Sequence, residues 1–130
     1  MKYLFDTDCL IDAIGNRFNA RELVALLGED GIAVSIITVA ETYDGAFGTE
    51  NPARTLAAFR DFLADYAALP VTDTVAARFA ELRSLLRRQG QPIPDMDLLI
   101  AATAVDTGLT LVTRNLRHFS RIPALRIYPH

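Results

Sequence analysis

Cysteine and lysine are almost absent from this chain of 130 residues, which contains one cysteine, Cys9, and one lysine, Lys2. A single cysteine cannot form an internal disulfide, and it lacks the partner thiolates that a cysteine-ligated zinc site needs. We expect Cys9 to be a small buried side chain. Any chemistry that requires a lysine late in the chain is also excluded.

Long apolar segments are missing as well. No stretch approaches the ~20 apolar residues that span a bilayer, and Asp6 interrupts the apolar run after Lys2, so we expect no signal peptide. The chain is 51% hydrophobic, which is sufficient for one domain with its own core. We therefore expect a single domain over residues 1–130, with no membrane segment and a cytoplasmic location.

The net charge of −3 is unevenly distributed. Residues 1–50 contain nine acids and three bases, whereas residues 51–130 contain seven acids and ten bases. Twelve of the thirteen bases are arginine, whose planar guanidinium binds phosphate in a bidentate manner. From charge alone we interpret these residues as solvated helix faces with surface ion pairs. An arginine-rich rim beside an acidic centre is the functional alternative.

Short β-rich segments alternate with longer helical patterns along the chain. Strands are predicted at 2–5, 32–36, 109–113 and, as a last edge strand, 125–129, with a short extended piece at 68–71. Helices are predicted at 9–15, 20–31, 38–48, 51–66, 72–90 and 95–108. This alternation predicts an α/β fold, a parallel β-sheet flanked by helices on both faces.

Polar side chains follow three of the predicted strands. They are Asp6, Thr7 and Asp8 after the first, Thr38 and Glu41 after the second, and Arg114 and Asn115 after the late strand. Ligands of parallel sheets bind beyond the carboxyl ends of the strands. We therefore expect a functional site at this edge of the sheet.

Most of these acids also have a structural explanation. Asp8 is expected to be the N-cap of the first helix, and Thr38 with Glu41 has the spacing of a capping box. Asp95 can cap the helix that begins there, while Asp97 in its first turn favours the helix dipole. One carboxylate would be sufficient to stabilise the N-terminus of this helix, so the second indicates another role.

The combination of acids at one edge favours a metal site. Asp6 follows a buried strand directly, and we place its functional role ahead of its role in a turn. Carboxylates that gather without a cation repel one another, and hard oxygen ligands select Mg²⁺ or Mn²⁺. The two histidines give no support to a transition-metal site, because His130 ends the chain and His118 lies among arginines, where a phosphate contact is more plausible.

A rival interpretation starts from the same "FDTD". A strand followed by Asp-x-Asp also opens the haloacid-dehalogenase-like phosphatases, in which the first Asp is a nucleophile and the second a general acid. That family needs a later basic residue, usually lysine, and a later pair of acids after a strand. This chain has no lysine beyond Lys2 and has "VTRN" at the late strand, so the interpretation is weak.

Three stretches together resemble the PIN-domain ribonucleases, and specifically the toxins of VapBC-type toxin–antitoxin modules. They are "YLFDTDCLID", "VSIITVAETYDG" and "IPDMDLLIAATAVDTGLTLVTRNLRHFSRIPALRI". The resemblance implies a single PIN-like domain and a metal-dependent endoribonuclease that a cognate antitoxin neutralises. A non-catalytic PIN-like scaffold is the remaining alternative, and the retention of all three acids of the family's triad argues against it.

The resemblance also implies roles for individual residues. Asp6, Glu41 and Asp97 correspond to the acidic triad, and Asn115 to a fourth position that is often Asp in the family. Asp6 and Asp97 would be the main ligands of Mg²⁺ or Mn²⁺. Glu41 would orient the attacking water or act as base, and Asn115 would complete the shell. Asp95 could assist in holding the metal.

Partners follow from the same resemblance. RNA would be the substrate, and Arg114, Arg117, His118 and Arg121 would guide its backbone. The family forms homodimers whose two sites line one groove, and antitoxins block them. Apolar contact surface for these partners could come from the aromatic residues Phe18, Phe47, Phe59 and Tyr66, but for most of them we favour an ordinary place in the core.

Overall fold

Four parallel strands form the centre of the structure, a computed structural model in which residues 1–129 are described. The strands are β1 (Tyr3–Phe5), β2 (Ile32–Ser35), β3 (Ala67–Leu69) and β4 (Thr110–Val112). Their order in the sheet is β3-β2-β1-β4, so the first strand of the chain lies between the second and the last. The predicted parallel sheet is confirmed.

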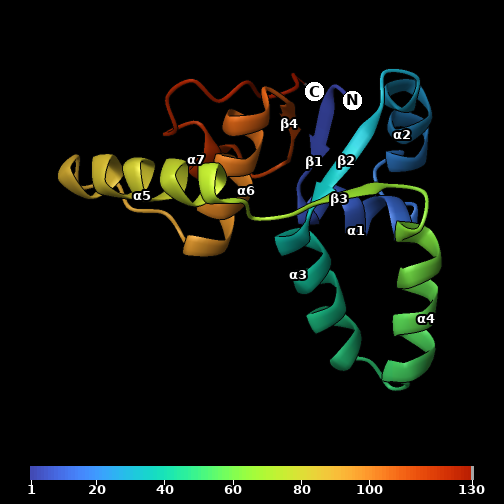
Figure 1. The fold of residues 1–130 in the computed structure, drawn as a ribbon. Coiled ribbons are helices and arrows are strands. Elements are labelled where there is room, and N and C mark those ends of the chain that lie inside the picture. Colours follow the sequence, from blue (N-terminus) through green and yellow to red (C-terminus); the bar gives the residue numbers. More distant parts are fainter. Residues whose placement is uncertain (130) are drawn as a thin grey trace.

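Seven helices connect and follow these strands in the described part of the chain. They are α1 (Thr7–Gly15), α2 (Ala20–Gly28), α3 (Ile36–Phe47), α4 (Pro52–Leu63), α5 (Asp73–Arg88), α6 (Asp95–Thr107) and α7 (Leu116–Phe119). Figure 1 shows α5, α6 and α7 on one side of the sheet and α1 and α2 on the other, while α3 and α4 extend beyond the carboxyl ends of β1 and β2. The predicted helices on both faces are confirmed, and only α7 was not predicted.

Alternate residues of each strand point to opposite faces and build two cores. Leu4 and Leu111 pack with Phe119 against α5 and α6, whereas Phe5 and Val34 belong to the core under α1, α2 and α4. This alternation is the two-residue period of a β-strand. Both faces of β1, β2 and β4 are covered, so these strands are mainly apolar on both sides rather than on one side only.

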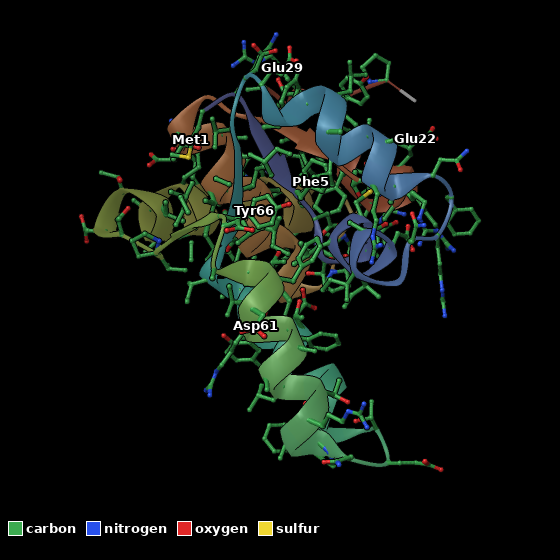
Figure 2. All side chains as sticks on the ribbon, turned by 90° about the vertical axis from the view of Figure 1, so that its right-hand side faces the viewer. Met1, Phe5, Glu22, Glu29, Asp61 and Tyr66 are labelled. Atoms are coloured by element: carbon green, nitrogen blue, oxygen red, sulfur yellow. The ribbon has the colours of Figure 1, made fainter. Side chains whose placement is uncertain are left out.

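Acidic side chains on and beside the outer helices face solvent, as Figure 2 shows for Glu22 of α2, for Glu29 directly after α2 and for Asp61 of α4. No helix within residues 1–129 combines the length and the hydropathy needed to cross a bilayer. Cys9 is buried, at 4% exposed, as predicted.

Two sequence predictions about apolar residues are wrong. Residues 125–129 do not form an edge strand: they make one isolated bridge, between Leu111 and Ile127, because hydrogen bonds reach the sheet only at Leu111 and Pro129 has no N–H to extend the ladder. A place in the core is also wrong for Phe18 and Phe47, which are 76% and 66% exposed. Phe59 and Tyr66 are half-buried.

The turn before β2 depends on Gly31. Its backbone has φ +90°, in the region that side chains disfavour, and a Cβ at this position would lie 2.9 Å from the Cα of Met1. The Gly31 carbonyl accepts hydrogen bonds from the N–H groups of Lys2 and Tyr3, at 3.0 and 3.1 Å. Gly31 therefore aligns the beginning of β1 with the beginning of β2.

We predict that Gly31→Ala lowers the free energy of unfolding by about 1–3 kcal/mol, because it adds both backbone strain and a contact with the main chain. The matched control is Gly45→Ala in α3, where an added Cβ meets nothing within 4 Å. The control should raise the free energy of unfolding by about 0.5–1 kcal/mol. Urea denaturation of both variants measures this, and equal effects would contradict the role of Gly31.

Candidate active site

Asp6 lies directly after β1 and is almost completely buried, at 4% exposed. It is the N-cap of α1: its Oδ1 accepts a hydrogen bond from the N–H of Thr7 at 2.8 Å. Its Oδ2 accepts from the Thr113 hydroxyl, also at 2.8 Å, and its own N–H donates to the carbonyl of Val112. The last residues of β4 therefore fix Asp6 at the edge of the sheet.

Asp8 is not the N-cap of the first helix, and that prediction is wrong because Asp6 occupies the position. Asp8 is the second residue of α1, where its Oδ1 accepts from the N–H of Cys9 at 2.6 Å. Its Oδ2 accepts from the N–H of Arg114 at 3.0 Å. Asp8 thus binds both the first turn of its own helix and the segment after β4.

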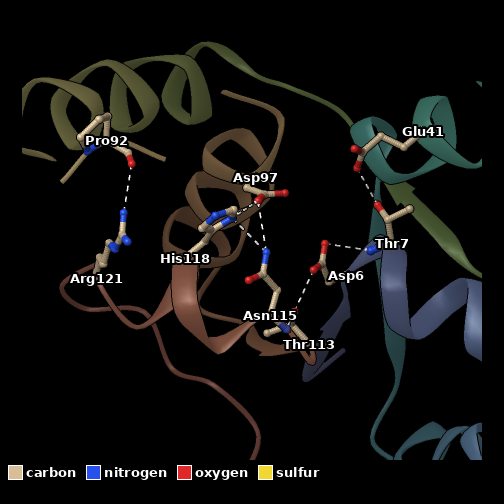
Figure 3. A network of polar contacts seen from close by, with 9 residues as sticks. All are labelled: Asp6, Thr7, Glu41, Pro92, Asp97, Thr113, Asn115, His118 and Arg121. Carbon is tan, nitrogen blue, oxygen red and sulfur yellow. Dashed lines mark hydrogen bonds and ion pairs between the residues drawn. The ribbon is translucent and has the colours of Figure 1, made fainter. Parts of the chain in front are cut away.

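Glu41 does not form a capping box with Thr38. Ser35 is the N-cap of α3 and accepts from the N–H of Ile37, so Thr38 already lies inside the helix and Glu41 in its second turn. The hydroxyl of Thr7 donates instead to Glu41 Oε1 at 2.7 Å. This contact turns Glu41 toward the end of β1 (Figure 3). A capping box therefore does not explain the carboxylate of Glu41.

Asp97 lies in the first turn of α6 and meets two groups of the segment after β4. His118 Nδ1 is 2.7 Å from Asp97 Oδ2, and Asn115 Nδ2 is 3.4 Å from the same oxygen. Because an ionised carboxylate only accepts hydrogen bonds, Nδ1 carries the proton in this contact. The amide of Asn115 then donates to Asp97, and not to the histidine ring that lies 3.0 Å away.

Sequence reasoning placed His118 among phosphate contacts and missed its place beside Asp97. The available signal was its spacing: Asn115 and His118 are three residues apart, which brings the N-cap of the short helix α7 and a residue of that helix to the same side. Arg121 is also held within the protein, since its guanidinium donates to the carbonyl of Pro92 at 3.1 Å (Figure 3).

The segment Thr113–Asn115 connects the acids to one another. Thr113 donates to Asp6, while the N–H of Arg114 donates to Asp8. The guanidinium of Arg114 forms an ion pair with the buried Asp12, with Nε–Oδ2 and Nη2–Oδ1 distances of 2.6 and 3.2 Å. Arg114 is therefore bound to an acid of this chain, whereas the expected RNA contact of Arg117 stays a prediction.

Asp95 was expected to cap α6 or to assist in binding a metal. The cap position is taken by Pro94, and Asp95 instead pairs with Arg83 of α5 at 3.0 Å. Both side chains are exposed, at 60% and 46%. Asp95 thus points to α5, although it is only two residues from Asp97.

Electrostatics around Asp6 favour a cation at the site. Burial and the negative charges of Asp8 and Asp97 raise the pKa of Asp6, hydrogen bonds from Thr113 and Thr7 lower it, and the net result is a pKa of about 7. Divalent cations with a preference for oxygen suit such a set of carboxylates. The carboxylate oxygens at this edge of the sheet are therefore chemically suited to bind Mg²⁺ or Mn²⁺.

No three His, Cys, Asp or Glu side chains in the described part of the chain are already close enough to hold an ion together. Their present partners explain the spacing: Thr7 holds Glu41, and His118 with Asn115 holds Asp97. Like charges also keep carboxylates apart when no cation lies between them. Binding an ion would therefore draw these side chains inward.

A family model described as PIN domain matches residues 3–125. The chain belongs to the PIN-domain family. This membership replaces the phosphatase alternative, and it agrees with the four-stranded parallel sheet and with the acids at its carboxyl edge.

Several PIN-domain proteins are similar over almost the whole chain. Ribonuclease VapC2 of Haemophilus influenzae is 39% identical, over 97% of this chain and 96% of that protein. The tRNA(fMet)-specific endonuclease VapC of Salmonella typhimurium is 33% identical, over 98% and 96%. Among solved structures, the DNA-bound VapBC of Salmonella typhimurium has a TM-score of 0.91 at 34% identity, over 98% and 97% of the two chains. VapBC2 of Rickettsia felis, bound to a DNA fragment from their promoter, has a TM-score of 0.91 at 29% identity, over 98% of both chains.

The raised pKa of Asp6 predicts a pH-dependent stability of the metal-free chain. A carboxyl whose pKa is higher in the folded state stabilises fully below its unfolded pKa of 3.8, and this contribution is lost as the pH rises through about 7. In the presence of chelator, Asp6→Asn should therefore gain stability relative to the parent between about pH 5 and about pH 8, on the order of 2 kcal/mol. Urea denaturation at the two pH values measures this gain, and a gap between variant and parent that stays constant would refute it.

The ion pair of Arg114 with Asp12 predicts a second stability effect. Arg114→Ala leaves the buried Asp12 carboxylate without its partner and should lower the free energy of unfolding by about 1–3 kcal/mol. Arg78→Ala is the control, because Arg78 pairs with Glu81 at 3.3 Å and both side chains are more than 40% exposed. Loss of that exposed pair should cost less than about 1 kcal/mol. Similar losses in both variants would contradict the prediction.

Proposed function

We propose that this chain is a metal-dependent endoribonuclease, the toxin of a type II toxin–antitoxin system. The observation that carries the proposal is its identity of 39% and 33%, over nearly its whole length, to proteins named as VapC ribonucleases. The acids that gather at the carboxyl edge of β1 support it. The substrate is RNA, and the reaction is hydrolysis of a phosphodiester bond.

Asp6 and Asp97 are the proposed metal ligands. Asp6 offers a carboxylate held in place by two hydrogen bonds, from Thr7 and Thr113. Asp97 has one oxygen occupied by His118, and Figure 3 shows its other oxygen directed away from that ring. When bound there, Mg²⁺ or Mn²⁺ would neutralise phosphate charge and promote the ionisation of water.

Glu41 is the proposed base, or the group that orients the attacking water. Its Oε1 is held by the Thr7 hydroxyl, so the carboxylate is aimed at the region that Asp6 faces. Asn115 contributes in two ways: its Nδ2 donates to Asp97, and this orientation leaves its amide oxygen free to complete the shell. These side chains are sufficient for one ion or for two.

The proposed partners follow from the solved relatives, which are VapBC complexes. A cognate antitoxin is proposed to bind and block the site, and the chain is proposed to form a homodimer. We place the protein in the cytoplasm, where RNA is found, and take residues 1–130 as one PIN-like nuclease domain.

We predict that the purified chain cleaves RNA with Mg²⁺ or Mn²⁺ and that chelator abolishes cleavage. Asp97→Asn keeps the shape of the side chain and removes its charge, so it should reduce the cleavage rate by about a hundredfold or more. Asp95→Asn is the matched control: the same change in the same helical turn, at a side chain that pairs with Arg83, should leave the rate near that of the parent. Total RNA and tRNA serve as substrates.

Two outcomes would contradict the proposal. Equal cleavage by the parent and Asp97→Asn would place the activity elsewhere or in a contaminant. If the parent cleaved no RNA with metal but bound its antitoxin equally well in chelator, the chain would be a PIN-like scaffold rather than a nuclease.

A further inference from the structure

Phe18 is the most exposed large apolar side chain in the described part of the chain, at 76%. It lies between α1 and α2, in the loop of residues 16–19. Exposure of a single phenylalanine is ordinary on a protein surface. The backbone conformation of Phe18 and the residues around it are unusual, and these residues connect Phe18 to the proposed active site.

The backbone at Phe18 is in the left-handed region, with φ 53°. Asn16 and Asn19 of the same loop have φ 52° and 57°. Asparagine tolerates this conformation, but a bulky aromatic residue does so at a cost in strain. The strained backbone and the exposed side chain both disfavour phenylalanine at this position. The stability of the fold therefore does not explain why residue 18 is aromatic.

The ring of Phe18 lies on the guanidinium of Arg114, with 4.9 Å between the Arg114 Cζ and the ring centroid. Asp12 orients that guanidinium through two hydrogen bonds. Arg114 is in turn flanked by Thr113 and Asn115, which bind Asp6 and Asp97. Phe18 therefore contacts, through the guanidinium of Arg114, the segment that holds the proposed active site.

Two arginines lie close to Phe18 in sequence, in the more acidic part of the chain. Residues 1–50 have only three bases, and two of them, Arg17 and Arg21, lie within three residues of Phe18. Arg21 donates to the carbonyls of Ala13 and Ile14 and so closes the end of α1. The immediate sequence neighbours of Phe18, Arg17 and Asn19, are exposed and polar.

We propose that Phe18 is a stacking platform for a base of single-stranded RNA that is bound at the proposed active site. This rests on the proposed function. One face of the ring lies on Arg114, and the opposite face is left for a base, which stacks on aromatic side chains without regard to its sequence. Arg17 provides positive charge for the neighbouring phosphates. The platform would hold one nucleotide of an unstacked, extended strand whose scissile phosphate lies at Asp6 and Asp97.

A protein partner is the less favoured occupant of this surface. Protein interfaces exclude water around an apolar centre, and the sequence neighbours of Phe18 are polar and cationic instead. Phe47, at 66% exposed at the end of α3, is a comparable aromatic side chain without an arginine under its ring among the described contacts. It provides a matched control.

The first test uses fluorescence. The chain contains no tryptophan, so Phe18→Trp introduces a single indole at the proposed platform. In an Asp97→Asn background, which prevents cleavage, single-stranded oligoadenylate or oligouridylate of about twelve nucleotides should quench the indole emission. An abasic ribose-phosphate chain of the same length should not. Phe47→Trp, in the same background, should respond to neither.

The second test measures affinity by fluorescence anisotropy of the labelled oligonucleotides. Phe18→Leu keeps an apolar side chain over Arg114 but removes the aromatic face, and should weaken binding of base-containing RNA about tenfold or more. Binding of the abasic chain should not change, because that chain reports phosphate contacts alone. Phe47→Leu should leave both affinities unchanged.

The outcomes separate this proposal from the proposed function. If Phe18→Leu binds and cleaves RNA as the parent does, and the indole emission is unchanged, the platform is overturned and the nuclease stands. If both Phe18→Leu and Phe47→Leu weaken antitoxin binding but not RNA binding, Phe18 belongs to a protein interface. If the parent chain neither binds nor cleaves RNA, the proposed function itself fails.

Discussion

The hydrogen bond from Thr113 to Asp6 joins the two ends of the chain at the carboxyl edge of the sheet. It spans 2.8 Å between groups that are 107 residues apart in sequence. Burial and neighbouring acids make the Asp6 carboxylate difficult to ionise, and this hydrogen bond opposes them by favouring the charged form. Because β1 and β4 are neighbours in the sheet, the donor and the acceptor meet without a long loop.

Three consecutive residues after β4 bind four carboxylates at or near the site. Thr113 binds Asp6, Arg114 binds Asp8 through its backbone and Asp12 through its side chain, and Asn115 binds Asp97. Each contact satisfies a carboxylate that would otherwise repel its neighbours. Bringing these carboxylates together lowers the stability of the metal-free chain, but it provides a set of oxygens suited to a cation. Such a cost is expected where function and stability compete.

The sequence was sufficient for the sheet and for part of the site. Asp6 could be predicted because a carboxylate directly after a buried strand is recognisable, and family resemblance added Asp97. Glu41 was ambiguous, since a capping box and a site residue have the same spacing, and only the position of Ser35 decides between them. His118 and the exposure of Phe18 depend on how distant segments close against each other, which local patterns do not encode.

The sheet order also determines when the site can exist. The central strand, β1, is synthesised first, yet its partner β4 is synthesised more than a hundred residues later. Such non-local pairing is slow, because the loop must close before the contacts form. A nascent chain therefore cannot assemble these acids until β4 and Thr113–Asn115 have been synthesised and β4 has paired with β1.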